Sequence, residues 1–274
     1  MKRALLALLV LSTMSALLVA CNAGSSGAET VAGGSAMVVQ NGAPDGNAGN
    51  PRGDTIPLKE AKLNIEHNAT DNDTGFQGFI DSEGWKWLDV KGPDGVVLTL
   101  RGRGELGELG LTELFFESVE PANADVPIEE IIETLPEGNY RISGKAMESG
   151  ESAGTTSGTA WLSHDIPAGP VLLSPAAGAL VPAGELLVSW SPVTRTISGE
   201  DINIIAYQLI IEKDVEPHPH MIGKFGLSMY LPPTVTTVAV PGGFLEPATA
   251  YKWEVLAIEE SGNQTLSSGE FETE

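Results

Sequence analysis

The stretch LEPATAYKWEVLA, residues 245–257, decides the fold class of this chain. After Pro247 an apolar side chain stands at every second position. These positions are Tyr251, Trp253, Val255 and Ala257. Because successive side chains of a strand point to opposite sides of a sheet, a period of two residues is typical of a β-strand that buries one face.

Three further alternations of the same kind precede this stretch. They are Leu186, Val188 and Trp190; Ile205, Tyr207, Leu209 and Ile211; and Thr236, Val238 and Val240. Turn residues separate the runs, as in Ser191-Pro192 and Pro241-Gly242-Gly243, and no helix-length pattern lies between them. Short alternating strands divided by such turns predict an antiparallel β-sandwich.

The run Leu245-Glu246-Pro247-Ala248-Thr249-Ala250-Tyr251 resembles the tyrosine-corner motif of fibronectin type III domains, with Trp190 and Tyr207 in earlier strands. The resemblance covers residues 169–274. It implies a sandwich in which the Tyr251 hydroxyl turns back to the chain near Leu245, and a family whose members mostly serve as binding or spacing modules. The section 214–230 is longer than the family's usual connections, so the strand order there stays open.

Residues 56–168 have less regular apolar runs, which we interpret as a second, immunoglobulin-like β-sandwich with one short helix. The helix is expected over residues 126–135, because acids stand near its start and Pro136 ends it. A hairpin is expected to pair two sets of alternating residues. The sets are Tyr140, Ile142 and Gly144, and Thr159, Trp161 and Ser163. The proline-rich joint at residues 165–170 favours a fixed angle between the two domains.

The first twenty residues have the pattern of a secretory signal peptide, with Lys2 and Arg3 before an apolar run. Leu18-Val19-Ala20-Cys21 resembles the lipobox of bacterial lipoproteins. The resemblance implies that Cys21, the only cysteine, becomes an acylated (palmitate-bearing) N-terminus in the cell envelope. Asn22 favours the outer membrane if the cell is Gram-negative. The alternative is an ordinary signal peptide with an incidental cysteine.

Residues 21–55 are rich in Gly, Ala, Ser and Asn and show no sustained period, so we expect a flexible tether. The chain has a formal net charge of −22, and without residues 1–20 it has 13 Lys and Arg against 37 Asp and Glu, giving −24. Such a polyanion repels phosphate backbones, which excludes a basic nucleic-acid-binding surface. The expected partners are the membrane, through the lipid anchor, and an unidentified protein or glycan.

Two local patterns are candidate binding sites. Asp71 and Asp73 alternate with other oxygen-bearing residues, as in calcium-binding loops, although a solvated acidic turn has the same pattern. Trp85 and Trp87 lie two apart and would share one face of a strand. Exposed, they would form a stacking platform for sugar rings and make the chain a carbohydrate-binding lipoprotein; buried, they would be core. Calcium is the only cofactor that these patterns suggest.

Three further motifs resemble functional sites but lack the required context. Residues 150–154 fit the G-x-S-x-G pattern of hydrolases, with Ser152 as nucleophile, but no helix is expected to follow it. Residues 102–107 fit G-x-G-x-x-G without a helix start. His218 and His220 flank a proline in a loop with no third metal ligand defined. The sequence therefore favours a non-catalytic binding or spacer module over a glycan binder or a serine hydrolase.

Overall fold

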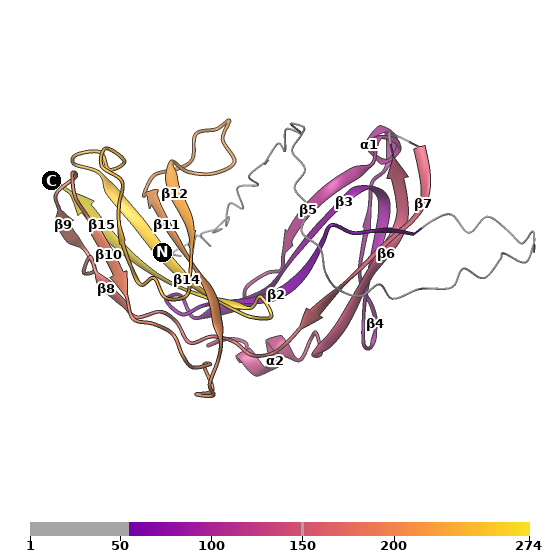
Figure 1. The fold of residues 1–274 in the computed structure, drawn as a ribbon, viewed down its shortest axis with the longest axis horizontal. Helices are drawn as coiled ribbons and strands as arrows, with labels where there is room; N and C mark the ends of the chain where they lie inside the picture. The colour runs from indigo at the N-terminus through magenta and orange to yellow at the C-terminus, as the bar shows by residue number, and fades with distance from the viewer. Residues whose placement is uncertain (1–54, 149–150) are drawn as a thin grey trace, which may run out of the picture. The chain divides into compact units, whose positions relative to one another are not determined.

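The computed structural model describes residues 55–148 and 151–274, and Figure 1 shows their arrangement. The signal peptide, Cys21 and the tether up to residue 54 lie outside the described residues. In the described ranges no helix has both the length and the apolar character needed to cross a bilayer.

We call the elements before residue 165 the N-terminal body. Its elements are β1 (Thr55–Pro57), β2 (Glu60–Asn68), β3 (Asp73–Gly92), β4 (Gly95–Arg101), α1 (Gly104–Leu109), β5 (Leu111–Glu117), α2 (Ile128–Ile132), β6 (Gly138–Glu148) and β7 (Glu151–Leu162). The remaining elements form the C-terminal body. They are β8 (Leu172–Ser174), β9 (Ala179–Val181), β10 (Leu187–Trp190), β11 (Ile204–Lys213), β12 (Gly226–Leu231), β13 (Thr237–Ala239), β14 (Ala250–Glu259) and β15 (Gln264–Thr273).

The C-terminal body is a fibronectin type III-like sandwich. A three-stranded sheet in the order β13-β10-β8 packs against the strands β15-β14-β11-β12, and all these pairs are antiparallel. The long middle section contributes β12, which pairs with β11 and thereby completes this strand order.

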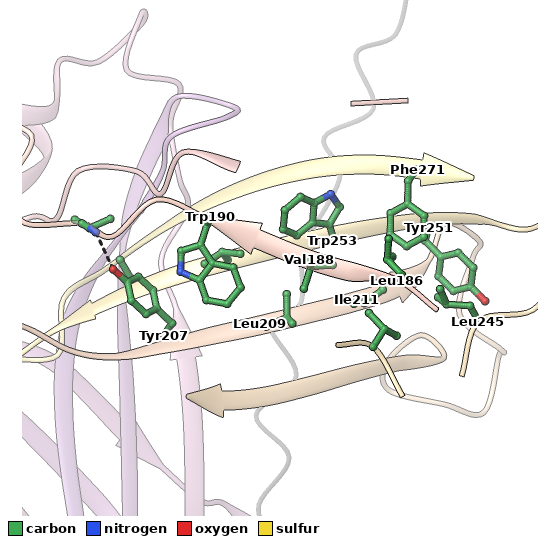
Figure 2. Packing of buried hydrophobic residues seen from close by; sticks show 14 of the residues in the cluster. Leu186, Val188, Trp190, Tyr207, Leu209, Ile211, Leu245, Tyr251, Trp253 and Phe271 are labelled. Atoms are coloured by element: carbon green, nitrogen blue, oxygen red, sulfur yellow. Dashed lines mark hydrogen bonds between the residues drawn. The ribbon is translucent and has the colours of Figure 1, made fainter. Parts of the chain in front are cut away.

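The apolar alternations of the sequence form the core of this sandwich, as Figure 2 shows. Trp190 and Tyr207 meet edge to face, with their ring centroids 5.5 Å apart. Tyr251 stacks on Phe271 with a centroid separation of 5.4 Å. Trp190 on β10 and Tyr207 on β11 belong to the two facing sheets, so their contact stabilises the packing between them. Tyr251 and Phe271 are cross-strand neighbours within one sheet, and their contact stabilises the pairing of β14 with β15.

The tyrosine corner predicted from the sequence is confirmed. Tyr251 is buried, and its hydroxyl accepts a hydrogen bond of 2.8 Å from the backbone N–H of Glu246. Tyr207 makes an equivalent contact, because its hydroxyl accepts from the backbone N–H of Val193 at 2.7 Å. Each hydroxyl thus accepts a hydrogen bond from a backbone N–H group in a connecting segment, where no neighbouring strand supplies an acceptor.

The N-terminal body is built around the long strand β3, which pairs with different neighbours along its length. Its first half pairs with β2 and β5, and its second half with β6 and β4. Between the halves the register shifts twice, at residues 81–85 and 85–87. Such bulges bend a strand, and the bent sheet encloses a second apolar cluster. The cluster includes Ile65, Ile80, Trp85, Leu88, Tyr140, Ile142 and Leu162.

The predicted hairpin of β6 and β7 exists, but the predicted register is wrong by one residue. Tyr140 pairs with Ala160 and Ile142 with Gly158, rather than with Trp161 or Thr159. A shift of one residue moves every side chain to the other face of the sheet. Ala160 and Leu162 are consequently buried, and Trp161 is 54% exposed.

The described residues contain two short helices, where one was expected. The predicted helix corresponds to α2, which is shorter than the range 126–135. The second, α1, begins at Gly104 inside the G-x-G-x-x-G pattern, so the expectation of no helix start there is wrong. Gly107 of α1 packs against the backbone of Gly102. The glycines of this pattern therefore allow two backbone segments to approach closely.

We expect Tyr251→Phe to lower the free energy of unfolding by about 1 kcal/mol, because the part-buried hydrogen bond from the N–H of Glu246 loses its acceptor while the ring packing remains. Urea unfolding measures the change. Tyr230→Phe is the matched control, since Tyr230 is 60% exposed, and it should change stability by less than about 0.5 kcal/mol. Equal effects of the two substitutions would contradict a structural role of the corner.

Candidate functional site at the seam between the two bodies

The two bodies share hydrogen-bonded strands. The first residues of β15 pair in parallel with the end of β2, in the register Gln264↔Glu66, Thr265↔His67 and Leu266↔Asn68. One continuous sheet therefore runs from β1 in the N-terminal body to β12 in the C-terminal body (Figure 1). We call the region around this β2–β15 pairing the seam.

Asn263, directly before β15, joins the two bodies through its side-chain amide. It is 1% exposed, and its Oδ1 accepts a hydrogen bond of 2.8 Å from the backbone N–H of Ile65 on β2. Its Nδ2 donates to the carbonyl oxygens of Ser163 and Asp165, each at 3.0 Å. Backbone groups that are buried without a hydrogen-bond partner destabilise the fold. This single amide provides partners both for the N–H in the middle of β2 and for the carbonyls that follow β7.

A buried carboxylate holds the turn that carries Asn263. Glu259 is 2% exposed and accepts hydrogen bonds from the backbone N–H groups of Ser261 and Asn263, at 2.8 and 2.9 Å. Gly262, between them, has a φ of 103°, which a glycine adopts without strain. The turn therefore presents the Asn263 amide to the N-terminal body in one orientation.

The connecting segment between the bodies is also hydrogen-bonded to the C-terminal body. The hydroxyl of Thr265 on β15 donates to the carbonyl of Pro167 at 2.6 Å, and the N–H of Ala168 donates to the carbonyl of Arg195 at 2.8 Å. These two bonds hold the middle of the joint against the C-terminal body.

Three carboxyl groups meet beside the seam. Glu66 on β2, Glu117 at the end of β5 and Glu120 after it each place an oxygen within 4.8 Å of the other two. Glu66 is 4% exposed, although it lies on the face of β2 opposite to the core residue Ile65. We call these three residues the acidic cluster, and in the described ranges they are the only group of three side chains with this geometry.

A glycine makes room for the acidic cluster. Gly75 on β3 is the cross-strand partner of Glu66. A Cβ atom at Gly75 would lie 2.7 Å from Cγ of Glu120 and 2.8 Å from Oγ of Ser118. The missing side chain therefore lets the segment after β5 cross over β3 and bring Glu120 to Glu66.

Two glutamines link the acidic cluster to the C-terminal body. Gln264 on β15 donates from Nε2 to Glu66 and, at 3.1 Å, to Oε1 of Gln77 on β3. Gln77 in turn donates to Oε1 of Glu117 at 2.9 Å. These neutral amides donate hydrogen bonds to some of the carboxyl oxygens of the acidic cluster, but they add no positive charge that would offset its negative charge.

Burial and mutual repulsion shift the titration of this cluster. The pKa of the Glu66 carboxyl is raised from 4.5 to about 7, chiefly by burial, which outweighs the hydrogen bond from Gln264, and in part by repulsion from the Glu117 carboxyl. Burial likewise raises the pKa of Glu120 to about 8, with added repulsion from Glu66, Glu117 and Asp73. Oxygen-only ligands suit a hard divalent cation, and close carboxyl groups also share protons, so the arrangement is suited to binding either.

The predicted calcium ligands Asp71 and Asp73 lie at the turn between β2 and β3. Asp71 is exposed and accepts a hydrogen bond of 3.0 Å from Nδ2 of Asn68, whose Oδ1 accepts from the N–H groups of residues 70 and 71. Burial raises the pKa of Asp73, and Asp71 adds to the shift. Within the described chain, neither aspartate belongs to a group of three ligand atoms. The turn therefore has the hydrogen bonding of an ordinary Asx turn.

The prediction that Trp85 and Trp87 share a face is wrong. Trp85 pairs with Ala146 and Trp87 pairs with Lys145, the next residue of β6, so Lys86 is an extra, unpaired residue that forms a bulge in β3. Because the adjacent residues Ala146 and Lys145 point to opposite faces of the sheet, Trp85 and Trp87 also point to opposite faces. Trp85 is buried in the core at 1% exposure, and Trp87 is half-buried outside it. The two indoles form no common platform.

The hydrolase pattern also lacks its required geometry. Ser152 is exposed near the start of β7, and the chain continues as a strand to Leu162 rather than turning into a helix. An extended strand of this length separates Ser152 from His164 by about 30 Å. His164 instead places Nε2 2.9 Å from the carbonyl oxygen of Leu135. No serine–histidine pair is assembled here.

The histidine pair in the loop after β11 is exposed. The rings of His218 and His220 are 5.5 Å apart between centroids, and Nδ1 of His218 accepts the backbone N–H of His220. Among the described side chains no third ligand completes a group with them.

Comparison with known proteins finds similarity only among solved structures. No protein-family model matches the chain, and no curated protein matches it. The FN1–FN3 domains of chicken CNTN1 align at 14% identity over 80% of this chain, which spans 64% of their length, with a TM-score of 0.31. A two-domain fibronectin type III segment of chicken tenascin aligns at 11% identity over 79% of this chain and 99% of its own, with a TM-score of 0.29.

A single-domain structure shows a similar level of likeness. The third fibronectin III domain of the human KIAA0343 protein aligns at 19% identity over 40% of this chain and 86% of its own, with a TM-score of 0.30. The fibronectin type III-like description of the C-terminal body rests on its own strand order and on the corner at Tyr251.

We expect Asn263→Ala to lower the free energy of unfolding by about 2–4 kcal/mol, because it leaves the N–H of Ile65 and two carbonyls unpaired in a buried place. Urea unfolding measures the loss. Asn203→Ala is the matched control, since Asn203 is exposed and donates one hydrogen bond, to Glu260. It should cost less than about 0.5 kcal/mol. A similar small cost at both positions would contradict the importance of the Asn263 amide.

Proposed function

We propose that this chain is a lipid-anchored protein of the bacterial cell envelope whose two β bodies act together as a rigid, non-catalytic spacer or binding module. The observation that carries the proposal is the seam. A strand pairing shared by both bodies, with a buried amide of the C-terminal body bonded to the N-terminal body, supports a module of fixed geometry rather than two domains on a flexible link.

The lipid anchor is proposed from the lipobox at residues 18–21. Three acyl chains on Cys21 would hold the protein stably at a bilayer, whereas one chain alone binds only marginally. The tether at residues 21–55 then sets the reach of the two bodies from the membrane, and Asn22 favours the outer membrane. Repulsion between the mature charge of −24 and anionic lipids supports an orientation in which the body stands away from the surface.

The serine hydrolase alternative finds no support, because Ser152 near the start of β7 and His164 after its end lie apart. The partner we propose is a protein or a glycan bound by surfaces of the two bodies, and the net charge disfavours nucleic acid. The glycan-binding alternative based on Trp85 and Trp87 loses its support, because Trp85 is buried.

Cell fractionation tests the anchor. We expect the wild-type chain in the membrane fraction, released by detergent, and Cys21→Ala essentially completely outside that fraction, because no acyl chain can attach. Asn22→Gln keeps the cysteine and serves as the matched control, which should stay with the membrane. Retention of Cys21→Ala in the membrane fraction would contradict the proposed lipid anchor.

Distance measurement tests the fixed geometry of the joint. In the Cys21→Ala background the chain has no other cysteine, so spin labels can be placed at Thr159 on β7 and Glu272 on β15, both exposed. Double electron–electron resonance spectroscopy should give one narrow distribution of the distance between the two labels. Asn263→Ala should broaden it, because the amide that joins the bodies is lost. A broad distribution already in the parent protein would argue against a spacer of fixed geometry.

A further inference from the structure

We propose that Glu66, Glu117 and Glu120 form a proton-binding cluster that holds the seam closed while it carries a proton and loosens the seam when all three carboxyl groups are ionised. The proposal concerns the joint between the two bodies. It does not depend on the lipid anchor or on the identity of a partner.

The positions of the three carboxyl groups make full ionisation unfavourable. Their oxygens lie within 4.8 Å of one another, and Glu66 is 4% exposed. Like charges at this separation, away from bulk water, disfavour each other's ionised form. A proton on one carboxyl group removes its repulsion with the other two and lets it donate a hydrogen bond to one of them, so that a single repulsion remains.

Within the described ranges, no lysine or arginine forms an ion pair with these three carboxyl groups. Asp73 on β3 and Glu254 on β14 add negative charge, and Gln264 on β15 and Gln77 on β3 are neutral. Lys252 on β14 is paired with Glu254 at 2.9 Å. His67, the next residue after Glu66, points to the other face of β2.

The cluster acts on the seam through Glu66. This residue stands at the register position where β15 begins to pair with β2, and its carboxyl accepts the Nε2 hydrogen of Gln264. Glu120 is brought against it over Gly75. When Glu66 and Glu120 are both ionised, their repulsion displaces the residue on which the β15 contact depends. The protonated cluster leaves this contact undisturbed.

The direction of the pH dependence follows from the raised pKa values. Glu66 and Glu120 titrate at about 7 and about 8 in the folded chain, against 4.5 for the ordinary carboxyl. Between 4.5 and about 8 the folded chain therefore binds more protons than the unfolded chain. The stability contributed by the proton is fully present below pH 4.5, falls as the pH rises through this window and is lost above about pH 8.

Urea unfolding between pH 5 and pH 9, in buffer with EDTA so that no divalent cation replaces the proton, gives the first readout. For the wild type we expect the unfolding constant to rise by about tenfold or more from pH 5.5 to pH 8.5. Glu66→Gln and Glu120→Gln should each remove most of that rise. Glu270→Gln is the matched control, because Glu270 is an exposed residue of β15, and it should keep the rise while removing the same charge.

Two measurements on the intact chain separate the proposal from a purely structural role of these residues. Carbon-13 titration of the glutamate carboxyls should show at least one cluster resonance with a midpoint above pH 6, which requires no variant to fold. The distance distribution between labels at Thr159 and Glu272 should be narrow at pH 6 and broader at pH 9, and Glu66→Gln should keep it narrow at both. Midpoints all below pH 5.5, an unchanged pH dependence in Glu66→Gln, or a distribution that ignores pH would each overturn the proposal.

Discussion

The structure depends on one short parallel pairing, in which three residues of β15 continue the sheet of the N-terminal body at the edge of β2. An unpaired strand edge leaves backbone donors and acceptors without partners, and β2 and β15 satisfy each other's groups at this edge. The amide of Asn263 completes the arrangement, because it bonds the N–H of Ile65 and two carbonyls at the start of the joint. Two separate cores thereby become one hydrogen-bonded unit.

The pairing of β2 with β15 also determines where the acidic cluster lies. Glu66 lies on the outer face of β2, where an isolated strand would leave it in water. The β15 contact covers it from one side, and the segment after β5 covers it from the other by crossing the bare backbone of Gly75. The acidic cluster is therefore a consequence of the seam, and we propose that its ionisation state in turn affects the seam.

The C-terminal body could be predicted from sequence almost completely, because its information is local. The alternation through Tyr251, Trp253, Val255 and Ala257 defines a buried face, and the corner motif defines the turn before it. The N-terminal body was predicted less well, since β3 changes face at an extra residue, Lys86, that no pattern of apolar residues reveals. The hairpin register failed for a similar reason, because Thr159 and Trp161 alternate as regularly as Ala160 and Leu162. The acidic cluster was missed entirely: its members are up to 54 residues apart in the chain, and only the fold joins them.

The central claim is that the two bodies form one rigid unit through the seam. Residual dipolar couplings of backbone amides in residues 55–148 and 151–274, measured near pH 6 in a dilute aligning medium, test it most directly. The account predicts that couplings from both bodies fit a single alignment tensor with the β2–β15 pairing intact. Two tensors of clearly different magnitude, one for each body, would show independent motion and contradict it.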